Sequence, residues 1–368
     1  MCYWSQSRLF HTIIFNSKPS PGSRNVDPKT QARRLLQVVE SSPHLLLHIR
    51  NLSLPDSSAA LLAILSSREW PAMEALRLRY IPPVNEGCMR DIQRLVAAPS
   101  LRSLELIVTH NAWNIDYFTH ILAHASQTVT SLRLKACVEP SAHATHGTPQ
   151  YPLSSPSRNP SFILDHLDMS SSAVLDALDQ PHFAQCLSDV REMRYGYILW
   201  GTQHSLLNRL GRQLQWLELE SSDYSVANLA WDEMPLLTHL RCDLQHDTVV
   251  NVLNRLPPDN MLTTLTLTTT HELWQAESLD QRRIGLQLDH VVADQLPRLR
   301  AACVEVAVTP RYRGKTRIPR VDRERVTREL EEALPRLKGN GMLSIIFLPR
   351  QYAWWLSDVF RELPLEED

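Results

Sequence analysis

A six-residue pattern of apolar and variable positions recurs along most of the chain. In each copy, an apolar residue is followed by two variable residues, a second apolar residue, one variable residue and a third apolar residue. The copies span 49–54, 73–78, 101–106, 129–134, 164–169, 190–195, 214–219, 237–242 and 262–267, with weaker copies at 299–304 and 342–347. Because successive side chains of a strand point to opposite faces, the alternating end of each copy predicts a short strand with one apolar face.

The spacing of the copies predicts how the strands are connected. The nine clearer copies begin 23 to 28 residues apart, except for one step of 35 residues. Between them, apolar residues at helical spacing predict helices over 57–68, 87–97 and 246–256. A strand and a returning helix, repeated at this period, are typical of a leucine-rich-repeat solenoid. The sequence therefore predicts an α/β fold of about eleven units, with a curved parallel sheet on the concave face and helices on the convex face.

The variable residue between the last two apolar positions is charged in seven consecutive copies. Its sign alternates without a break, in the order Arg77, Glu105, Arg133, Asp168, Arg194, Glu218 and Arg241. Neighbouring strands lie about 4.8 Å apart, so like charges at these positions would repel and opposite charges attract. The alternation therefore predicts a row of neighbouring opposite charges across the sheet, which we call the charge ladder.

Interruptions of the pattern divide the chain into parts. Residues 1–16 are predicted to hold the end of a helix and a following strand, and the repeat array is predicted over 28–348. Within the array, the proline- and serine-rich segment 139–160 predicts a long surface loop. Apolar spacing predicts a helix over 322–337. The segment 349–368, which contains two adjacent tryptophans, is predicted to form a cap over the end of the array, followed by a tail.

The inventory of chemical motifs indicates no catalytic centre. The chain has only 10 glycines among 368 residues, and it contains no phosphate-binding glycine loop, zinc-protease helix motif or serine-hydrolase elbow. The six cysteines stand singly, without a Cys-x-x-Cys pair. The sequence therefore predicts a protein that is not an enzyme and that holds no cofactor and no metal.

Charge and hydropathy bear on location and partners. The formal net charge is -2, which creates no field that would favour nucleic acid or an anionic membrane. No apolar run approaches the roughly 20 residues needed to cross a bilayer. We therefore expect a cytoplasmic or nuclear protein with no membrane partner.

One candidate surface for binding a partner surrounds Trp216, which the register places in the open on a strand. The residues assigned to it are Trp216, Glu192, Arg194, His239 and Arg241. An exposed tryptophan beside arginine is typical of an interface anchor. Packing of Trp216 over side chains of the neighbouring strands is an equally compatible interpretation.

A second candidate surface is the basic segment 311–328. Its proposed anion-binding residues are Arg311, Arg313, Lys315, Arg317 and Arg320. Such a segment fits a phosphopeptide or nucleic acid, but a charge run is more often a solvated face, so nucleic acid is an unfavoured partner.

The first residues carry a further signal. Trp4 and the run Arg8-Leu9-Phe10 precede an apolar strand at 12–15, and a helix that ends in Glu-Ser-Ser-Pro-His at 40–44 precedes the first repeat. This arrangement resembles the junction between the F-box and the repeats in the F-box/leucine-rich-repeat family of mushroom-forming fungi. The resemblance implies the substrate-recognition part of an SCF-type ubiquitin ligase receptor, with Trp4, Arg8, Leu9 and Phe10 as a remnant of its adaptor side. The F-box proper lies further upstream in that family, so the ligase adaptor is expected as a partner only if a complete F-box precedes this chain.

The function expected from the sequence is thus a non-enzymatic protein–protein interaction module whose protein substrate is unknown. Two alternatives remain open. One is a stand-alone repeat scaffold with no link to a ligase. The other is an anion- or nucleic-acid-binding protein that acts through 311–328.

Overall fold

The fold was analysed in a computed structural model of the whole chain. The structure describes residues 8–15, 27–55, 57–79, 81, 86–108, 115–136, 159–169, 178–196, 205–219, 229–244, 248–257, 259–270, 279–308 and 322–349. The chain divides into two compact units, Met1–Leu210 and Gly211–Asp368. Each unit is an α/β structure in which parallel strands follow one another in chain order.

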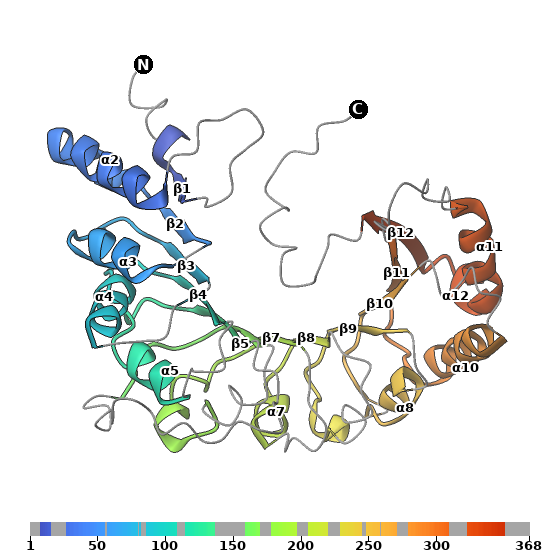
Figure 1. Cartoon of the computed structure of the whole chain (residues 1–368). Coiled ribbons are helices and arrows are strands. Elements are labelled where there is room, and N and C mark those ends of the chain that lie inside the picture. The colour runs from blue at the N-terminus through green and yellow to red at the C-terminus, as the bar shows by residue number, and fades with distance from the viewer. Residues whose placement is uncertain are drawn as a thin grey trace, which may run out of the picture. The chain divides into compact units, whose positions relative to one another are not determined.

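Unit 1 contains seven described strands. They are β1 (Thr12–Ile14), β2 (Asn51–Leu54), β3 (Ala75–Arg79), β4 (Ser103–Val108), β5 (Ser131–Ala136), β6 (His166–Met169) and β7 (Glu192–Tyr195). Its helices include α2 (Pro28–Ser41), α3 (Ala59–Ser66), α4 (Glu86–Val96) and α5 (Ile115–Leu122), with short 3-10 turns at Pro43–Leu47 and Pro181–Phe183. The helix α7 (Ser205–Gly211) ends at the first residue of unit 2. In Figure 1, α3, α4 and α5 lie on one side of the strands of this unit.

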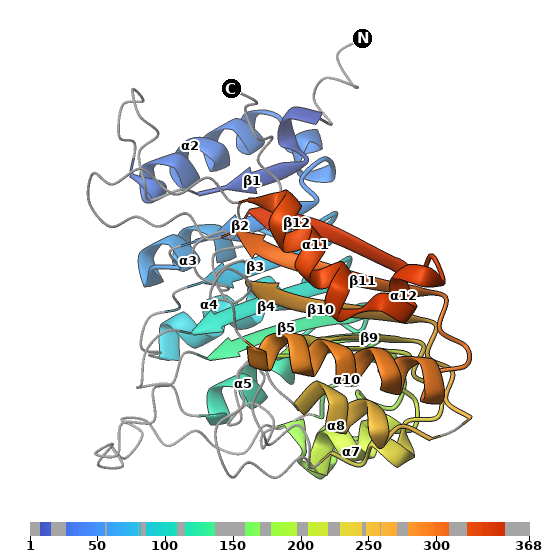
Figure 2. The ribbon, with the colours of Figure 1, turned by 90° about the vertical axis from the view of Figure 1, so that its right-hand side faces the viewer.

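Unit 2 contains five described strands. They are β8 (Trp216–Leu219), β9 (His239–Asp243), β10 (Thr264–Thr270), β11 (Ala301–Val308) and β12 (Leu343–Pro349). Its helices include α8 (Thr248–Asn254), α10 (Leu279–Gln295), α11 (Arg323–Ala333) and α12 (Pro335–Gly339), with a 3-10 turn at Trp231–Glu233. Figure 2 shows α8, α10, α11 and α12 together on one side of these strands.

Strand pairing follows the register of the six-residue pattern. Leu76 pairs with Leu104, and Leu104 pairs with Leu132, so equivalent positions of successive copies lie side by side. The apolar positions of the nine clearer copies are all buried. Each fully buried leucine, isoleucine or valine contributes about 1.5–3 kcal/mol relative to an exposed one. The repeated pattern thus places the core between the strands and the helices of each unit.

The start of most described strands is fixed by a shared carbonyl group. The carbonyl oxygen of Arg50 accepts hydrogen bonds from the amides of Glu74 and Ala75, at 2.7 and 3.0 Å. The carbonyl oxygen of Gln215 does the same for Thr238 and His239 in unit 2, at 2.8 and 3.0 Å. Because the same backbone arrangement recurs in both units, the copies are repeats in three dimensions as well as in sequence.

The sequence-based helices and strands are found with one correction. The helices predicted over 57–68, 87–97 and 246–256 correspond to α3, α4 and α8, and the strand predicted at 12–15 is β1, which pairs with β2. The single helix predicted over 322–337 is instead two helices, α11 and α12, separated at Leu334. Pro335 explains the break, because proline restricts the residue before it and cannot donate a backbone hydrogen bond.

Several predictions fall wholly or mainly outside the described residues. These are most of the loop 139–160 and almost all of the cap and tail at 349–368. No helix in the described part of the chain is long and apolar enough to cross a membrane.

Candidate functional site

The side chains that alternate with the core positions form a polar face on the strands of each unit. The first polar face consists of Arg77, Arg79, Glu105, Arg133, Lys135, His166, Asp168, Glu192 and Arg194 on β3–β7. The second polar face consists of Trp216, Glu218, His239, Arg241, Thr264, Thr266 and Glu305 on β8–β11. Within each unit, the strand register places the predicted charge ladder on these faces.

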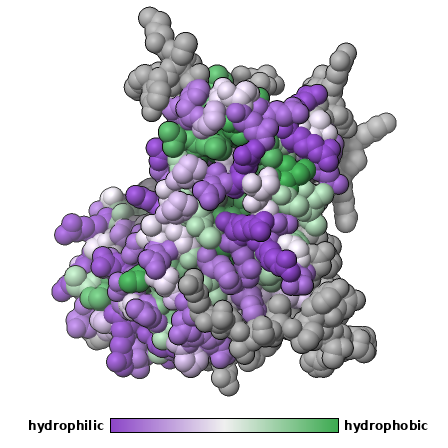
Figure 3. Space-filling model, turned by 90° about the vertical axis from the view of Figure 1, so that its left-hand side faces the viewer, coloured by the Kyte–Doolittle hydropathy of each residue, from purple (hydrophilic) through white to green (hydrophobic). Residues whose placement is uncertain are grey.

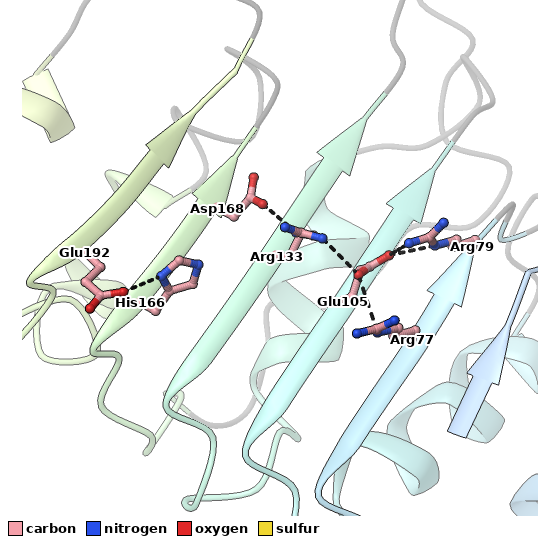
Figure 4. Close-up of polar contacts among 7 residues, drawn as sticks. All are labelled: Arg77, Arg79, Glu105, Arg133, His166, Asp168 and Glu192. Atoms are coloured by element: carbon pink, nitrogen blue, oxygen red, sulfur yellow. Dashed lines mark hydrogen bonds and ion pairs between the residues drawn. The ribbon is translucent and has the colours of Figure 1, made fainter. Parts of the chain in front are cut away.

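Glu105 is the centre of an ion network on the first polar face (Figure 4). The side chain of Arg79 donates from Nε and Nη2 to Glu105 Oε1, at 2.7 and 2.6 Å. Both side chains are about 95% removed from solvent, with 4% and 5% exposed. The other carboxylate oxygen, Oε2, lies 3.4 Å from Arg133 Nη1 and 3.9 Å from Arg77 Nε. Three arginines from the two neighbouring strands, β3 and β5, therefore converge on one buried carboxylate of β4.

The network continues across the next strands. Arg133 also pairs through Nε with the carboxylate of Asp168, whose side chain is 2% exposed. Farther along, His166 Nδ1 lies 3.3 Å from Glu192 Oε2 in a more exposed pair. Glu105, Arg133 and Asp168 confirm the alternation of the charge ladder within unit 1. The burial of Glu105 and Asp168 was not predicted, because the sequence placed these side chains on an open strand face.

Lys135 is the unusual cation of the first polar face. Its register partner on β4 is Ile107, and Ile107 in turn pairs with Arg79 on β3. The residue is 5% exposed. Its side chain makes no hydrogen bond or ion pair with any residue that the structure describes. The side chain is buried as a whole, although its Nζ is not among the fully buried polar atoms that lack a partner. Because nearby protein screens its charge less than water does, this cation can attract an anionic partner.

On the second polar face, one arginine is shared by two carboxylates. Arg241 pairs through Nη1 with Glu218 on the preceding strand, and through Nη2 with Glu305 Oε2 at 2.5 Å. The three side chains are between 12% and 22% exposed. Arg241 Nε is buried and has no hydrogen-bond partner. The pair between Glu218 and Arg241 confirms the charge ladder in unit 2, and Glu305 adds a carboxylate that the ladder did not include.

Trp216 and His239 stand side by side on neighbouring strands of the same face. Their ring centroids are 4.8 Å apart and their planes differ by 9°. Trp216 nevertheless remains 41% exposed. The packing interpretation of Trp216 is confirmed by this stack, whereas the interface-anchor interpretation stays a prediction, for a ring that still presents a large aromatic surface to solvent.

The hydrogen bonds around His239 favour one tautomer. The hydroxyl oxygen of Thr238 lies 2.9 Å from the carbonyl oxygen of Gln215 and 2.9 Å from His239 Nδ1. When the hydroxyl donates its single proton to the carbonyl oxygen, Nδ1 of the imidazole is the donor in the second bond. In that arrangement Nε2 of neutral His239 is an acceptor, and it makes no hydrogen bond with a described residue.

The candidate residues chosen from the sequence separate into two groups. Trp216, His239 and Arg241 lie together on the second polar face, whereas Glu192 and Arg194 belong to β7 of unit 1. The proposed anion-binding residues Arg311, Arg313, Lys315, Arg317 and Arg320 lie outside the described residues, as does Trp4.

The N-terminal candidates lie at the surface of unit 1. Arg8 and Leu9 are exposed, Leu9 to 74%, and Phe10 is half-buried. On the side of the molecule that carries α2, apolar residues lie among polar ones at the surface (Figure 3). Exposed apolar side chains near this end include Leu9, Ile14, Val38 and Leu47.

Sequence reasoning missed Arg79 and Lys135. Each directly follows the third apolar position of its copy, so the six-residue pattern ended just before it. Extending the strand by one residue would have placed both side chains on the polar face, because alternation continues to the end of a strand. Glu305 was missed for the same reason, since it follows the pattern at 299–304.

The other groups with possible chemistry are metal ligands and cysteine thiols. No group of three or more potential metal ligands occurs among the described residues. Burial raises the pKa of the Cys88 thiol to about 11, with the charge of Asp91 acting in the same direction. Burial also raises the pKa of Cys186 to about 11. Thiols with raised pKa values hold little thiolate near neutral pH and are poor nucleophiles.

Comparison with known proteins assigns no family to this chain. No family model and no curated protein matches the chain. A solved structure that matches is an active-site mutant of Rhizomucor miehei β-1,3-glucanosyltransferase in complex with laminaritriose. The two chains are 15% identical, the match covers 50% of this chain and 75% of the other, and the TM-score is 0.22.

The matching structure is an enzyme, which contradicts two expectations drawn from the sequence. These are that the chain is not an enzyme and that it is a non-enzymatic protein–protein interaction module of the ligase-receptor kind. Both expectations are therefore withdrawn. The physical reason for the error is that a repeat of apolar positions reports packing and not chemistry, and one fold can carry many functions. The likeness supplies no reaction in their place, because at this TM-score it carries no argument about activity.

Proposed function

We propose that each unit is a run of leucine-rich repeats, and that the first polar face binds an anionic ligand that bears carboxylate or phosphate groups. The repeat assignment is supported by the period of the pattern and by the pairing of equivalent positions, such as Leu76 with Leu104. The binding proposal is carried by Lys135, a cation that is 5% exposed and has no counter-charge among the described residues.

The charge balance of the first polar face supports an anionic ligand. Among the described residues of β3–β7, five cationic side chains and three carboxylates share this face: Arg77, Arg79, Arg133, Lys135 and Arg194 against Glu105, Asp168 and Glu192. Two of the three carboxylates are buried and already paired with arginine. Of these cations, Lys135 has no ion pair with a described residue, and its charge is the one that a ligand from outside the chain would balance.

The positions of the cations suit an acidic group. Arg79 and Lys135 occupy equivalent positions near the carboxyl ends of their strands, with one strand between them. Arginine binds carboxylate and phosphate through directed hydrogen bonds, and lysine adds a compact point charge. Because the site is largely removed from water, each new ion pair would be screened less than one at the surface. These cations are different residues from the basic segment 311–328, and that segment has no part in the proposal.

The test is stabilisation by citrate, a compact tricarboxylate, measured as a shift in melting temperature at low ionic strength. A ligand at a hundred times its Kd stabilises the folded state by about 2.7 kcal/mol. We expect citrate to raise the melting temperature of the wild-type chain, and we expect Lys135→Met to abolish most of that rise. Without citrate, Lys135→Met should melt at the same temperature or higher, because it removes an unpaired buried charge.

Lys29→Met is the matched control, since Lys29 lies on α2 of the same unit and away from the strands. It should keep the full citrate response. Citrate also stabilises proteins generally, because it is excluded from their surfaces. An equal response in wild type, Lys135→Met and Lys29→Met would show this general effect alone and would overturn the proposal.

A further inference from the structure

The second polar face presents a set of groups that the anionic-ligand proposal does not use. An exposed aromatic ring, an imidazole acceptor and an excess of carboxylate lie on neighbouring strands of unit 2. We infer that this face binds a guanidinium group, as carried by the arginine side chains of a peptide. The inference is independent of the proposed function, because it concerns another unit, other residues and a ligand of opposite charge.

The exposed ring of Trp216 offers an aromatic surface on which a guanidinium group can stack. Trp216 is 41% exposed although its ring is already stacked on His239. Tryptophan is the side chain whose ring attracts a cation most strongly, and guanidinium is planar and weakly hydrated, so it stacks on such a ring more readily than ammonium. The stack with His239 holds the indole in one orientation, which lowers the entropic cost of binding.

His239 supplies a hydrogen-bond acceptor beside this ring. When the Thr238 hydroxyl donates to Gln215, Nδ1 of His239 donates to that hydroxyl, and neutral His239 presents Nε2 as a lone-pair acceptor with no partner among the described residues. A guanidinium group has five N–H donors and no acceptor. An acceptor beside an aromatic ring therefore matches guanidinium and opposes an anionic ligand, which would bring only further acceptors.

The described charged side chains of the second polar face include more carboxylates than cations. Of the side chains described on the second polar face, Glu218 and Glu305 are carboxylates and Arg241 is the single cation. All three are mostly buried, so their fields are screened less than those of surface charges. Trp216 and Glu218 lie on the same strand, and His239 and Arg241 occupy the equivalent positions on the next. The excess negative charge thus lies close to the ring and to the acceptor.

The experiment measures binding of an N-acetylated tetra-arginine amide to the full chain by isothermal titration calorimetry. We expect Trp216→Leu to weaken binding by about tenfold or more, and Trp216→Phe to weaken it less, because a smaller ring retains part of the attraction. Tetra-lysine should bind more weakly than tetra-arginine if planar stacking contributes. Tetra-citrulline, which has a similar shape without the charge, should not bind measurably.

Leu236→Ala is the matched control, because Leu236 is also a large exposed apolar residue of unit 2 but lies in a turn outside the strands. It should bind tetra-arginine like the wild type. Glu305→Gln provides a second variant, which should weaken binding while Glu218 keeps Arg241 paired. Equal affinity of wild type and Trp216→Leu for tetra-arginine, or equal affinity of the wild type for the citrulline peptide, would refute the inference.

Discussion

The two polar faces occupy equivalent strand positions but differ in how their charges are balanced. On the first, three arginines converge on Glu105, and Lys135 has no described counter-charge. On the second, two carboxylates converge on Arg241, and an exposed aromatic pair lies beside them. One repeat pattern thus supports faces of opposite character, because only the apolar positions are required for packing.

The difference also concerns redundancy. Removing Glu105 from the first polar face would leave Arg79, which is 4% exposed, without its hydrogen-bonded carboxylate. Removing Glu218 from the second would leave Arg241 still paired with Glu305. The same chemical change should therefore have unequal consequences in the two units, and this inequality can be measured.

The largest expected effect is that of Glu105→Gln. Breaking a buried pair by removing one partner leaves an uncompensated charge and costs about 3–5 kcal/mol. The matched change Glu218→Gln should cost about 1–2 kcal/mol, since Arg241 keeps its ion pair with Glu305. Urea unfolding followed by circular dichroism gives both free energies. A cost for Glu218→Gln that equals or exceeds the cost for Glu105→Gln would contradict the proposed difference in redundancy.

A smaller effect compares the helix layers of the two units. In unit 2 the carboxylate of Asp289, on α10, accepts hydrogen bonds from the amides of Arg336 and Leu337 at 2.9 and 3.0 Å, at the start of α12. In unit 1 the hydroxyl of Ser66 on α3 donates to Asp91 on α4 at 2.6 Å. Both bonds join neighbouring helices. Only the first uses a buried charge that satisfies two backbone amides.

We expect Asp289→Ala to lower the free energy of unfolding by about 1–3 kcal/mol, because the buried amide of Leu337 and the part-buried amide of Arg336 lose their acceptor. Ser66→Ala should cost about 0.5–1.5 kcal/mol. Hydrogen exchange should localise the first loss to the amides of Arg336 and Leu337. Unchanged exchange at these two amides in Asp289→Ala would show that the carboxylate does not hold the start of α12.

The sequence predicted the parts of this fold that depend on periodicity. The apolar spacing identified β2–β12 and their order. Burying the leucine positions on one face leaves few other ways to place the strands. It also predicted neighbouring opposite charges at Glu105 and Arg133. Strand ends were less predictable. The six-residue pattern ends just before Arg79 and Lys135, but the strands continue through these residues.

Contacts between residues far apart in sequence could not be predicted. Arg241 reaches Glu305 across an intervening strand, which depends on side-chain length and strand extension and not on the repeat period. Asp289 contacts the start of α12 because two helices pack together, and no local sequence motif predicts this contact. Function was predicted least well, since the apolar period is the same whatever the polar face binds.

The smallest expected effect is a pH dependence specific to unit 1, which holds both Cys88 and Cys186. Burial raises the pKa of each thiol from an ordinary value of 9.0 to about 11 in the folded chain. Above about pH 9, the unfolded chain therefore loses these protons before the folded chain does. The stability contributed by the two neutral thiols is complete below pH 9 and is lost as the pH rises through 11, by about 1 kcal/mol for each thiol at pH 10.

Urea unfolding at pH 8 and pH 10 tests this difference when wild type is compared with a Cys88→Ala/Cys186→Ala variant. Other groups titrate in the same range, so the informative quantity is the additional loss of stability in the wild type. We expect the variant to be less stable at pH 8, because it has lost buried side-chain volume, but to lose less stability between the two pH values. Equal losses in wild type and the double variant would mean that the thiols of unit 1 are not held neutral by their burial.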